Sequence, residues 1–137
     1  MKNPLRGTAT ITRRNSTGLS VITVSLRMEG GEFDILTKFE KPVIIDPVKA
    51  YASQHESIEH LLHACEVAAQ SGVLSATRGF RPLSGRVVFT VFEGSKLQQD
   101  CEAGFATAAA LACFDALRQP ERARALDMQG WKEKIKT

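Results

Sequence analysis

The sequence predicts an α+β fold in which two helices cover one face of a four-stranded sheet. Apolar and polar residues alternate near the N-terminus, whereas two later segments repeat their apolar residues at helical spacing around one fully apolar run. The expected element order is therefore β-β-β-α-β-α, in a two-layer sandwich. With 137 residues, 43% hydrophobic and 24% charged, the chain has the size and balance of one globular domain.

The three predicted N-terminal strands cover residues 8–12, 22–28 and 33–39, in which apolar side chains are interleaved with polar ones. This period is typical of strands with one buried and one exposed face. Turn-forming residues at 15–18, and Gly30 with Gly31, separate the three segments. We therefore expect an antiparallel meander.

A first helix is predicted over residues 53–72, because its apolar residues recur at steps of three and four. Ser53 and Glu56 have the spacing of a capping box, and Gly72 is a typical helix stop. A loop over residues 75–85 is then expected to lead into a strand over 87–92, which is apolar on both faces and should be central.

Gly94 and Ser95 are expected to turn the chain toward a second helix over residues 101–118, which Pro120 would end. The many alanines of this helix indicate close approach to its neighbours. We divide the chain into a domain over residues 1–119 and a C-terminal tail over 120–137, which could dock as a short helix.

No segment carries a recognisable catalytic or phosphate-cradling motif, which favours a binding protein over an enzyme and predicts neither a cofactor nor a bound nucleotide. His60 and His63 share one helix face with Glu56, near His55, and are weak candidates for a metal site. The alternative is that these histidines are simply exposed. The three cysteines have no metal-type or redox-type spacing and are expected to be buried thiols in a reducing compartment.

Basic residues are the strongest candidates for ligand contacts, although the net charge of +3 permits a nucleic-acid partner without requiring one. Arg78 and Arg81 flank Phe80 in the predicted loop, and Arg86 follows closely. Guanidinium groups beside an aromatic ring suit phosphate contact and base stacking. The alternative is that Phe80 fills the edge of the core and the arginines are merely solvated.

The stretch 66–117 resembles the fourth domain of translation elongation factor G. The resemblance rests on a succession of short matches in order: a helix ending in Gly72-Val73-Leu74, the turn Gly79-Phe80-Arg81-Pro82, a strand, Gly94-Ser95, and an alanine-rich helix opening near Phe105. More loosely, it extends back to Thr8. This resemblance implies a left-handed crossover between the third and fourth strands, and a role in binding ribosomal or other structured RNA through the loop tips.

By that resemblance, Arg13, Arg14 and Lys96 at the tips and the loop from Arg78 to Arg86 are the candidate RNA contacts. The sequence departs from the family in its tip loops: residues 15–18 replace a long glycine-rich loop, and Leu97, Gln98 and Gln99 stand where the family has a histidine. The GTPase domain is absent, which excludes GTP hydrolysis.

Two further expectations remain. A protein–protein interaction or self-association module is the alternative to RNA binding, supported by the altered tips and the apolar tail around Trp131. A cytoplasmic location without membrane contact is expected, because the N-terminus has no apolar signal region and no apolar run is long enough to span a bilayer.

Overall fold

A computed structural model describes residues 5–15, 18–30, 36–39, 44–47, 58–78, 85–97, 101–128 and 130–133. Its helices are α2 (Ile58–Thr77), α3 (Cys101–Ala116) and the short α4 (Pro120–Ala125). Its strands are β1 (Leu5–Asn15), β2 (Gly18–Gly30), β3 (Leu36–Phe39), β4 (Ile44–Pro47), β5 (Gly85–Leu97) and β6 (Lys132–Glu133). Among these helices, none has the length and hydropathy that crossing a membrane requires.

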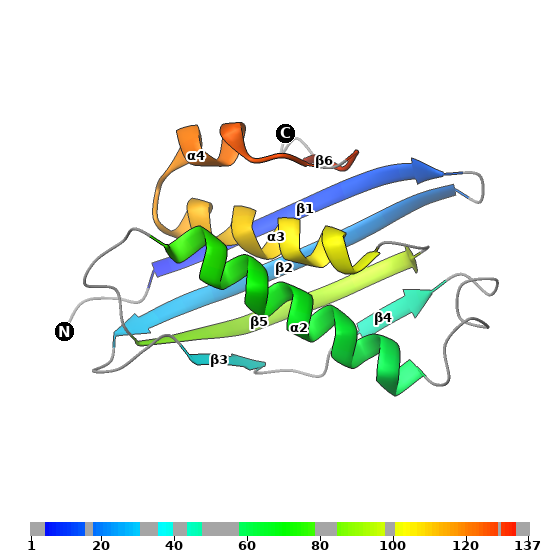
Figure 1. The fold of residues 1–137 in the computed structure, drawn as a ribbon, viewed down its shortest axis with the longest axis horizontal. Coiled ribbons are helices and arrows are strands. Elements are labelled where there is room, and N and C mark those ends of the chain that lie inside the picture. Colours follow the sequence, from blue (N-terminus) through cyan, green and yellow to red (C-terminus); the bar gives the residue numbers. More distant parts are fainter. Residues whose placement is uncertain are drawn as a thin grey trace.

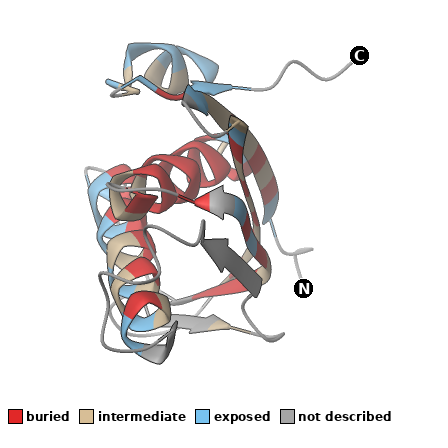
Figure 2. Ribbon diagram, turned by 90° about the vertical axis from the view of Figure 1, so that its right-hand side faces the viewer, coloured by how far each residue is buried: buried red, intermediate tan, exposed pale blue. Residues whose placement is uncertain are grey.

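The strands form one sheet in the order β3-β5-β2-β1-β6, and β4 also pairs with β5. Helices α2 and α3 lie on the same face of this sheet (Figures 1 and 2). The predicted two-layer α+β arrangement is therefore confirmed, and the opposite face of the sheet carries no described helix.

Alternation along β1 and β2 follows the sequence prediction. Ala9 and Ile11 on β1 are buried beneath the helices, whereas the alternate residues Thr8 and Thr10 are half-buried on the open face. The two strands pair antiparallel from Leu5 with Met28 to Asn15 with Gly18, which confirms the tight predicted turn.

The predicted meander is wrong at its third strand. β3 does not pair with β2 but with β5, in parallel, and so does β4. The reason lies in β5, where Val87, Val88 and Phe89 are all buried. A strand buried on both faces is typical of the interior of a sheet, and β5 lies between β2 and β3, which confirms its predicted central place.

The connection from β4 through α2 to the parallel strand β5 is a left-handed crossover. With the helices in front and both strands pointing upward, β5 lies to the left of β4 (Figure 1). Such connections are nearly always right-handed, so handedness is a specific feature of this fold.

The first helix is displaced from its predicted range, because α2 continues through Gly72 to Thr77 and its described part begins at Ile58. Ser53 and Glu56 lie outside the described residues. Gly72 is not a stop but a site of close packing: a Cβ atom there would lie 2.2 Å from the carbonyl oxygen of Ala106 on α3. The absence of a side chain at this position lets the two helices touch.

Two further predicted boundaries are wrong. Gly94 and Ser95 do not turn the chain but pair with β2 inside β5. α3 ends at Ala116 rather than Arg118, which adopts a left-handed backbone with φ of 56° in the following turn. Pro120 begins α4 instead of ending α3, in agreement with the preference of proline for the first helical turn.

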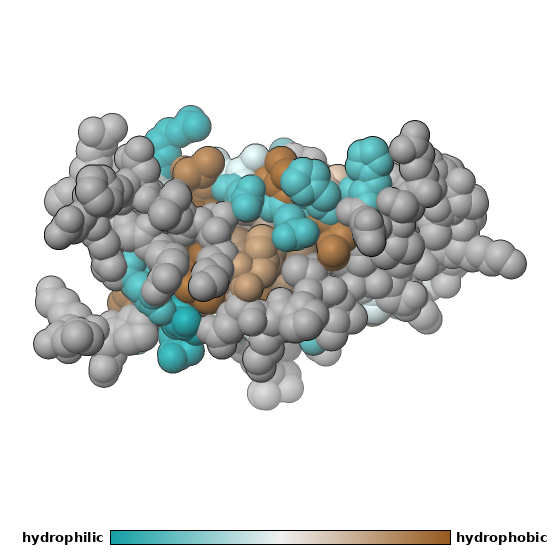
Figure 3. Space-filling model, turned by 90° about the horizontal axis from the view of Figure 1, so that it is seen from below, coloured by the Kyte–Doolittle hydropathy of each residue, from teal (hydrophilic) through white to brown (hydrophobic). Residues whose placement is uncertain are grey.

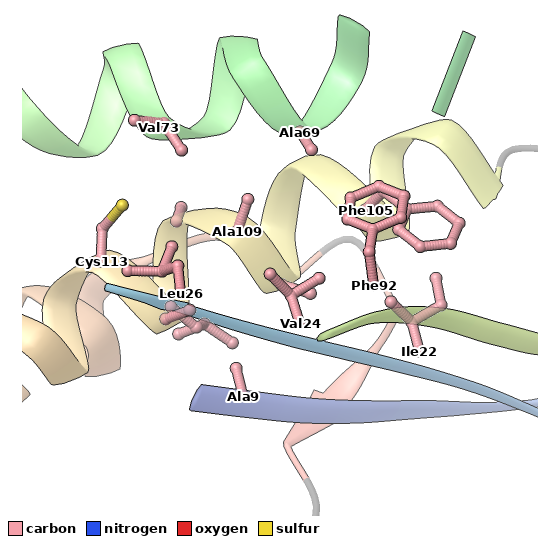
Figure 4. Packing of buried hydrophobic residues seen from close by; sticks show 14 of the residues in the cluster. Ala9, Ile22, Val24, Leu26, Ala69, Val73, Phe92, Phe105, Ala109 and Cys113 are labelled. Atoms are coloured by element: carbon pink, nitrogen blue, oxygen red, sulfur yellow. The ribbon is translucent and has the colours of Figure 1, made fainter. Parts of the chain in front are cut away.

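The core lies between α2, α3 and the sheet (Figure 4). α3 is buried almost all round, as a helix that is apolar on every side must be. Four phenylalanines continue the core across the sheet: the Phe92 ring stacks on Phe105 of α3 with centroids 4.5 Å apart, and Phe39 stacks on Phe89 at 4.8 Å. This packing fixes the helices over the sheet, and the described residues leave its two ends, its open face and the outer side of α2 uncovered.

Candidate nucleic-acid interface

The predicted basic residues fall into two groups at opposite ends of the sheet. Arg13 and Arg14 lie at the end of β1, and Lys96 lies near the end of β5. The pairing of Arg14 with Leu19, and of Val21 with Ser95, places these three backbone positions at one end, which we call the hairpin end (Figure 1). The side chain of Lys96 lies outside the described residues.

The second predicted group lies at the other end. Arg78 follows the last residue of α2 and is exposed, and Arg86 pairs with Glu29 through its backbone. Phe80 and Arg81, and the side chain of Arg86, lie outside the described residues. Since Arg86 and Lys96 lie about ten residues apart on one strand, the two ends are separated by roughly 33 Å. The predicted contacts that the structure describes therefore do not form one compact site.

At the hairpin end, Arg13 is committed to packing. Its guanidinium lies over the ring of Trp131, 4.5 Å from the ring centroid, and the side chain is half-buried. A cation held over an indole in this way stabilises the strand pairing of β1 with β6. Arg14 beside it is exposed and projects from the open face of the sheet.

Four arginines that the sequence analysis did not select gather with Arg78 at the opposite end. Arg6 is the second residue of β1, Arg118 lies in the turn after α3, and Arg122 and Arg124 belong to α4. We call this set the arginine end; its members are Arg6, Arg78, Arg118, Arg122 and Arg124. The close spacing of arginines at 118, 122 and 124 is the local signal in the sequence that could have identified them.

Several contacts bring the arginine end together around the last turn of α3. Arg122 donates a hydrogen bond of 3.5 Å from Nη2 to the carbonyl oxygen of Arg78, so α4 meets the end of α2. The same guanidinium lies 5.0 Å from the ring centroid of Phe114. Asp115 accepts a hydrogen bond from the backbone N–H of Thr8, which holds the start of β1 beside α3.

Among the described residues, charge at the arginine end is only partly compensated. Arg6, Arg78, Arg118 and Arg124 are exposed, and the exposed carboxylates close to them in sequence are Asp115, Glu121 and Asp127. Arg27 and Glu29, which lie toward the same end, form an ion pair of 2.6 Å and so cancel each other. α2 and α3 both end here, and their carbonyl ends add a partial negative charge that arginines offset.

The histidines do not assemble a metal site among the described residues. His60 and His63 are exposed on the outer side of α2, and no group of three or more potential ligands forms in the described part of the chain. His55 and Glu56 lie outside it. On the outer side of α2, Val67 and Leu74 are exposed as well, and Figure 3 shows hydrophilic and hydrophobic side chains interspersed on the described surface.

The open face of the sheet is uncharged along its middle. Thr8 shares a hydrogen bond of 2.7 Å with Ser25, and Thr10 one of 3.2 Å with Thr23, across the pairing of β1 and β2. These hydroxyl pairs lie on the side away from the helices, with Val21 and Val91 beside them. This face offers hydroxyl and methyl groups rather than charge.

A scan against models of known protein families finds no match, and a search of curated proteins finds none either. Among solved structures, the chain is similar to a protein of the bacterium Thermus thermophilus, with a TM-score of 0.46 and 17% sequence identity. That similarity covers 82% of this chain but 15% of the Thermus protein. Similarity of this degree identifies neither a family nor a function.

Proposed function

We propose that this chain is a non-catalytic binding domain for structured RNA, and that the arginine end makes the principal contact. The observation that supports this proposal is the gathering of Arg6, Arg78, Arg118, Arg122 and Arg124 from separate elements at one end of the sheet. The resemblance to the fourth domain of elongation factor G makes ribosomal RNA the first ligand to test.

Arginine is suited to this role because its planar guanidinium can form two parallel hydrogen bonds to a phosphate. Arg122 is already turned inward, toward the Arg78 carbonyl and the Phe114 ring. It therefore serves to anchor α4, and the exposed guanidiniums of Arg78, Arg118 and Arg124 remain for phosphate contact. Arg6 lies on the same side of β1 as Thr8 and Thr10, so it adds a cation on the open face at this end of the sheet.

The proposed contact differs from the one that the resemblance implies. The resemblance implies that loop tips at the hairpin end bind RNA, but Arg13 at that end packs on Trp131. Two exposed carboxylates also belong to this end: Glu93 lies two residues before Ser95, and Glu133 follows Lys132. Counting described side chains alone, the hairpin end presents Arg14 and Lys132 beside acidic groups, whereas the arginine end presents more exposed cations per carboxylate.

Equilibrium binding to small-subunit ribosomal RNA tests the proposal, with a single-stranded RNA of equal length as the control. We expect binding at low salt that weakens steeply as salt rises, because phosphate contacts release counterions. Preference for the folded RNA supports recognition of structure. Absence of binding at about 50 mM salt, or equal binding of both RNAs, would refute the proposal.

A second candidate function is docking to another protein through the open face of the sheet, which the uncharged hydroxyl rows of β1 and β2 favour. Self-association is the simplest form, since one such face can pack on another. Light scattering after size exclusion measures the mass in solution. A dimer that Thr10→Lys dissociates would support this function, and a monomer at high concentration would exclude the self-associating form.

A further inference from the structure

Two buried cysteines face each other between the helices. Cys65 of α2 and Cys101 at the start of α3 have their Sγ atoms 4.0 Å apart, within the distance of a thiol hydrogen bond. Both side chains are completely buried. The third cysteine, Cys113, is also buried but has no described sulfur neighbour.

The close packing of the helices explains this contact. Gly72 lets α2 approach the backbone of α3 at Ala106, and Cys65 and Ala69 lie on the same side of α2, toward α3 (Figure 4 labels Ala69). A disulfide bond requires a sulfur separation of about 2.05 Å, so the two sulfur atoms must approach by about 2 Å. Rotation of the two side chains, with a small shift of the helix start, can supply that distance.

We propose that Cys65 and Cys101 form an oxidisable pair, which a peroxide converts into an intramolecular disulfide that joins α2 to the first turn of α3. The thiolate of one cysteine attacks the peroxide O–O bond and becomes a sulfenic acid, releasing one water. The second sulfur then attacks the sulfenic sulfur, forms the S–S bond and releases another water. Two thiols and one hydrogen peroxide thus yield one disulfide and two waters.

Burial makes the two cysteines slow to react with peroxide, and their closeness makes them pair with each other rather than with Cys113. The pKa of the Cys65 thiol lies far above its ordinary value. The larger cause is the hydrogen bond between Cys65 and Cys101, and the second cause is burial. Because the thiolate is the reacting form, oxidation proceeds through brief local openings. Cys113 can open in the same way but has no described partner, so it cannot form the intramolecular bond.

The test compares the full-length protein with its Cys113→Ala variant after treatment of the folded chain with hydrogen peroxide. We expect both proteins to lose two hydrogen atoms in intact mass and to yield a linked peptide pair containing Cys65 and Cys101. The bond closes a loop between residues 36 positions apart, so the melting temperature should rise by at least about 5 °C and fall back after treatment with dithiothreitol.

Three outcomes would overturn the proposal. Addition of oxygen atoms without the loss of two hydrogens would show that the sulfur atoms oxidise separately. Linkage between chains, or linkage involving Cys113, would show that another pairing is preferred. Formation of the disulfide only in urea, and never in native buffer, would show that the folded helices hold the sulfur atoms apart.

Discussion

The packing around α3 and the arginine end differ in how far their side chains are buried. Around α3, side chains such as Phe105, Ala109 and Cys113 are completely buried, and a single added carbon at Gly72 would meet backbone. At the arginine end, the side chains of Arg78, Arg118 and Arg124 are exposed. Their substitution should therefore remove little packing. A change of side-chain volume should therefore destabilise the packing around α3, whereas a change of side-chain volume at the arginine end should have little effect on stability.

From this difference we expect stability and the proposed RNA binding to respond to different substitutions. Substitutions in the packing around α3 should change the free energy of unfolding, because buried volume and close approach determine it. Substitutions at the arginine end should change affinity for RNA while leaving stability nearly constant, since exposed charges contribute little to folding. The predictions below test this separation, beginning with the largest expected effect.

Trp131→Ala should cause the largest loss of stability, about 3 kcal/mol or more, because the indole is 2% exposed and lies against Ile22 and Gly104. Trp131→Phe is the matched control. The indole Nε1 has no hydrogen-bond partner among the described residues, so phenylalanine loses no hydrogen bond and should cost clearly less than alanine, about 1–2 kcal/mol for the smaller ring. Urea denaturation measures both, and equal losses in the two variants would contradict this account of the site.

Gly72→Ala should destabilise the protein by about 2 kcal/mol, although alanine favours helix by about 1 kcal/mol over glycine. The new Cβ atom would lie 2.2 Å from the Ala106 carbonyl oxygen, which can only be relieved by moving the helices apart. Ser71→Ala, at the exposed neighbouring position, should be neutral or slightly stabilising. Thermal unfolding measures the stability of the two variants. A Gly72→Ala protein more stable than the unmodified chain would show that the helices do not touch at this position.

Alkaline pH should weaken folding through the buried thiols. Burial raises the pKa of Cys113 from 9.0 to about 12. Between these values the unfolded thiol has lost its proton while the folded thiol retains it, so stability falls with rising pH, by up to about 1.4 kcal/mol per pH unit. Cys65, whose pKa is raised as well, adds to the loss in the same direction.

Denaturation in reducing buffer between about pH 8 and pH 10 measures this dependence. Cys113→Ala should retain a shallower decline than the unmodified chain, since one of the contributing thiols is gone. Parallel curves for the two proteins would show that Cys113 ionises equally in the folded and unfolded states.

The double substitution Arg78→Gln with Arg124→Gln should weaken RNA binding about fivefold, or about 1 kcal/mol, while the melting temperature stays within about 2 °C. Both side chains are exposed, so their removal leaves the packing of the described residues intact. Anisotropy titration and thermal unfolding of the same samples test the two halves of this prediction. A large loss of stability would show that these arginines belong to the packing rather than to the binding surface.

Local patterns predicted the elements that local interactions determine. Alternation identified β1 and β2, and the apolar run at Val87 identified the central strand. The parallel pairing of β3 and β4 with β5 could not be predicted, because no local period encodes which distant strand is the neighbour. Likewise, Gly72 has the local signature of a helix stop. The structure instead explains the glycine by close contact with Ala106 on another helix, where a side chain would not fit.

The candidate interface was predicted less completely than the fold. Arg78 was selected, but Arg6 and Arg118 are far from it in sequence and come near only through the packing of β1 and α4 against the end of α3. Arg13 was selected for its charge, and its place over the Trp131 ring depends on a pairing of β1 with β6 that the sequence does not reveal. Position in the fold, rather than residue type, decides which arginines are exposed.

The salt dependence of RNA binding tests most directly whether the arginine end is the contact surface. The slope of the logarithm of affinity against the logarithm of salt concentration counts the phosphates neutralised. Arg78→Gln with Arg124→Gln should make this slope shallower by about 1.5, and Arg14→Gln at the hairpin end should leave it unchanged. A slope that Arg14→Gln reduces and the double variant leaves intact would contradict the account and place the RNA at the hairpin end.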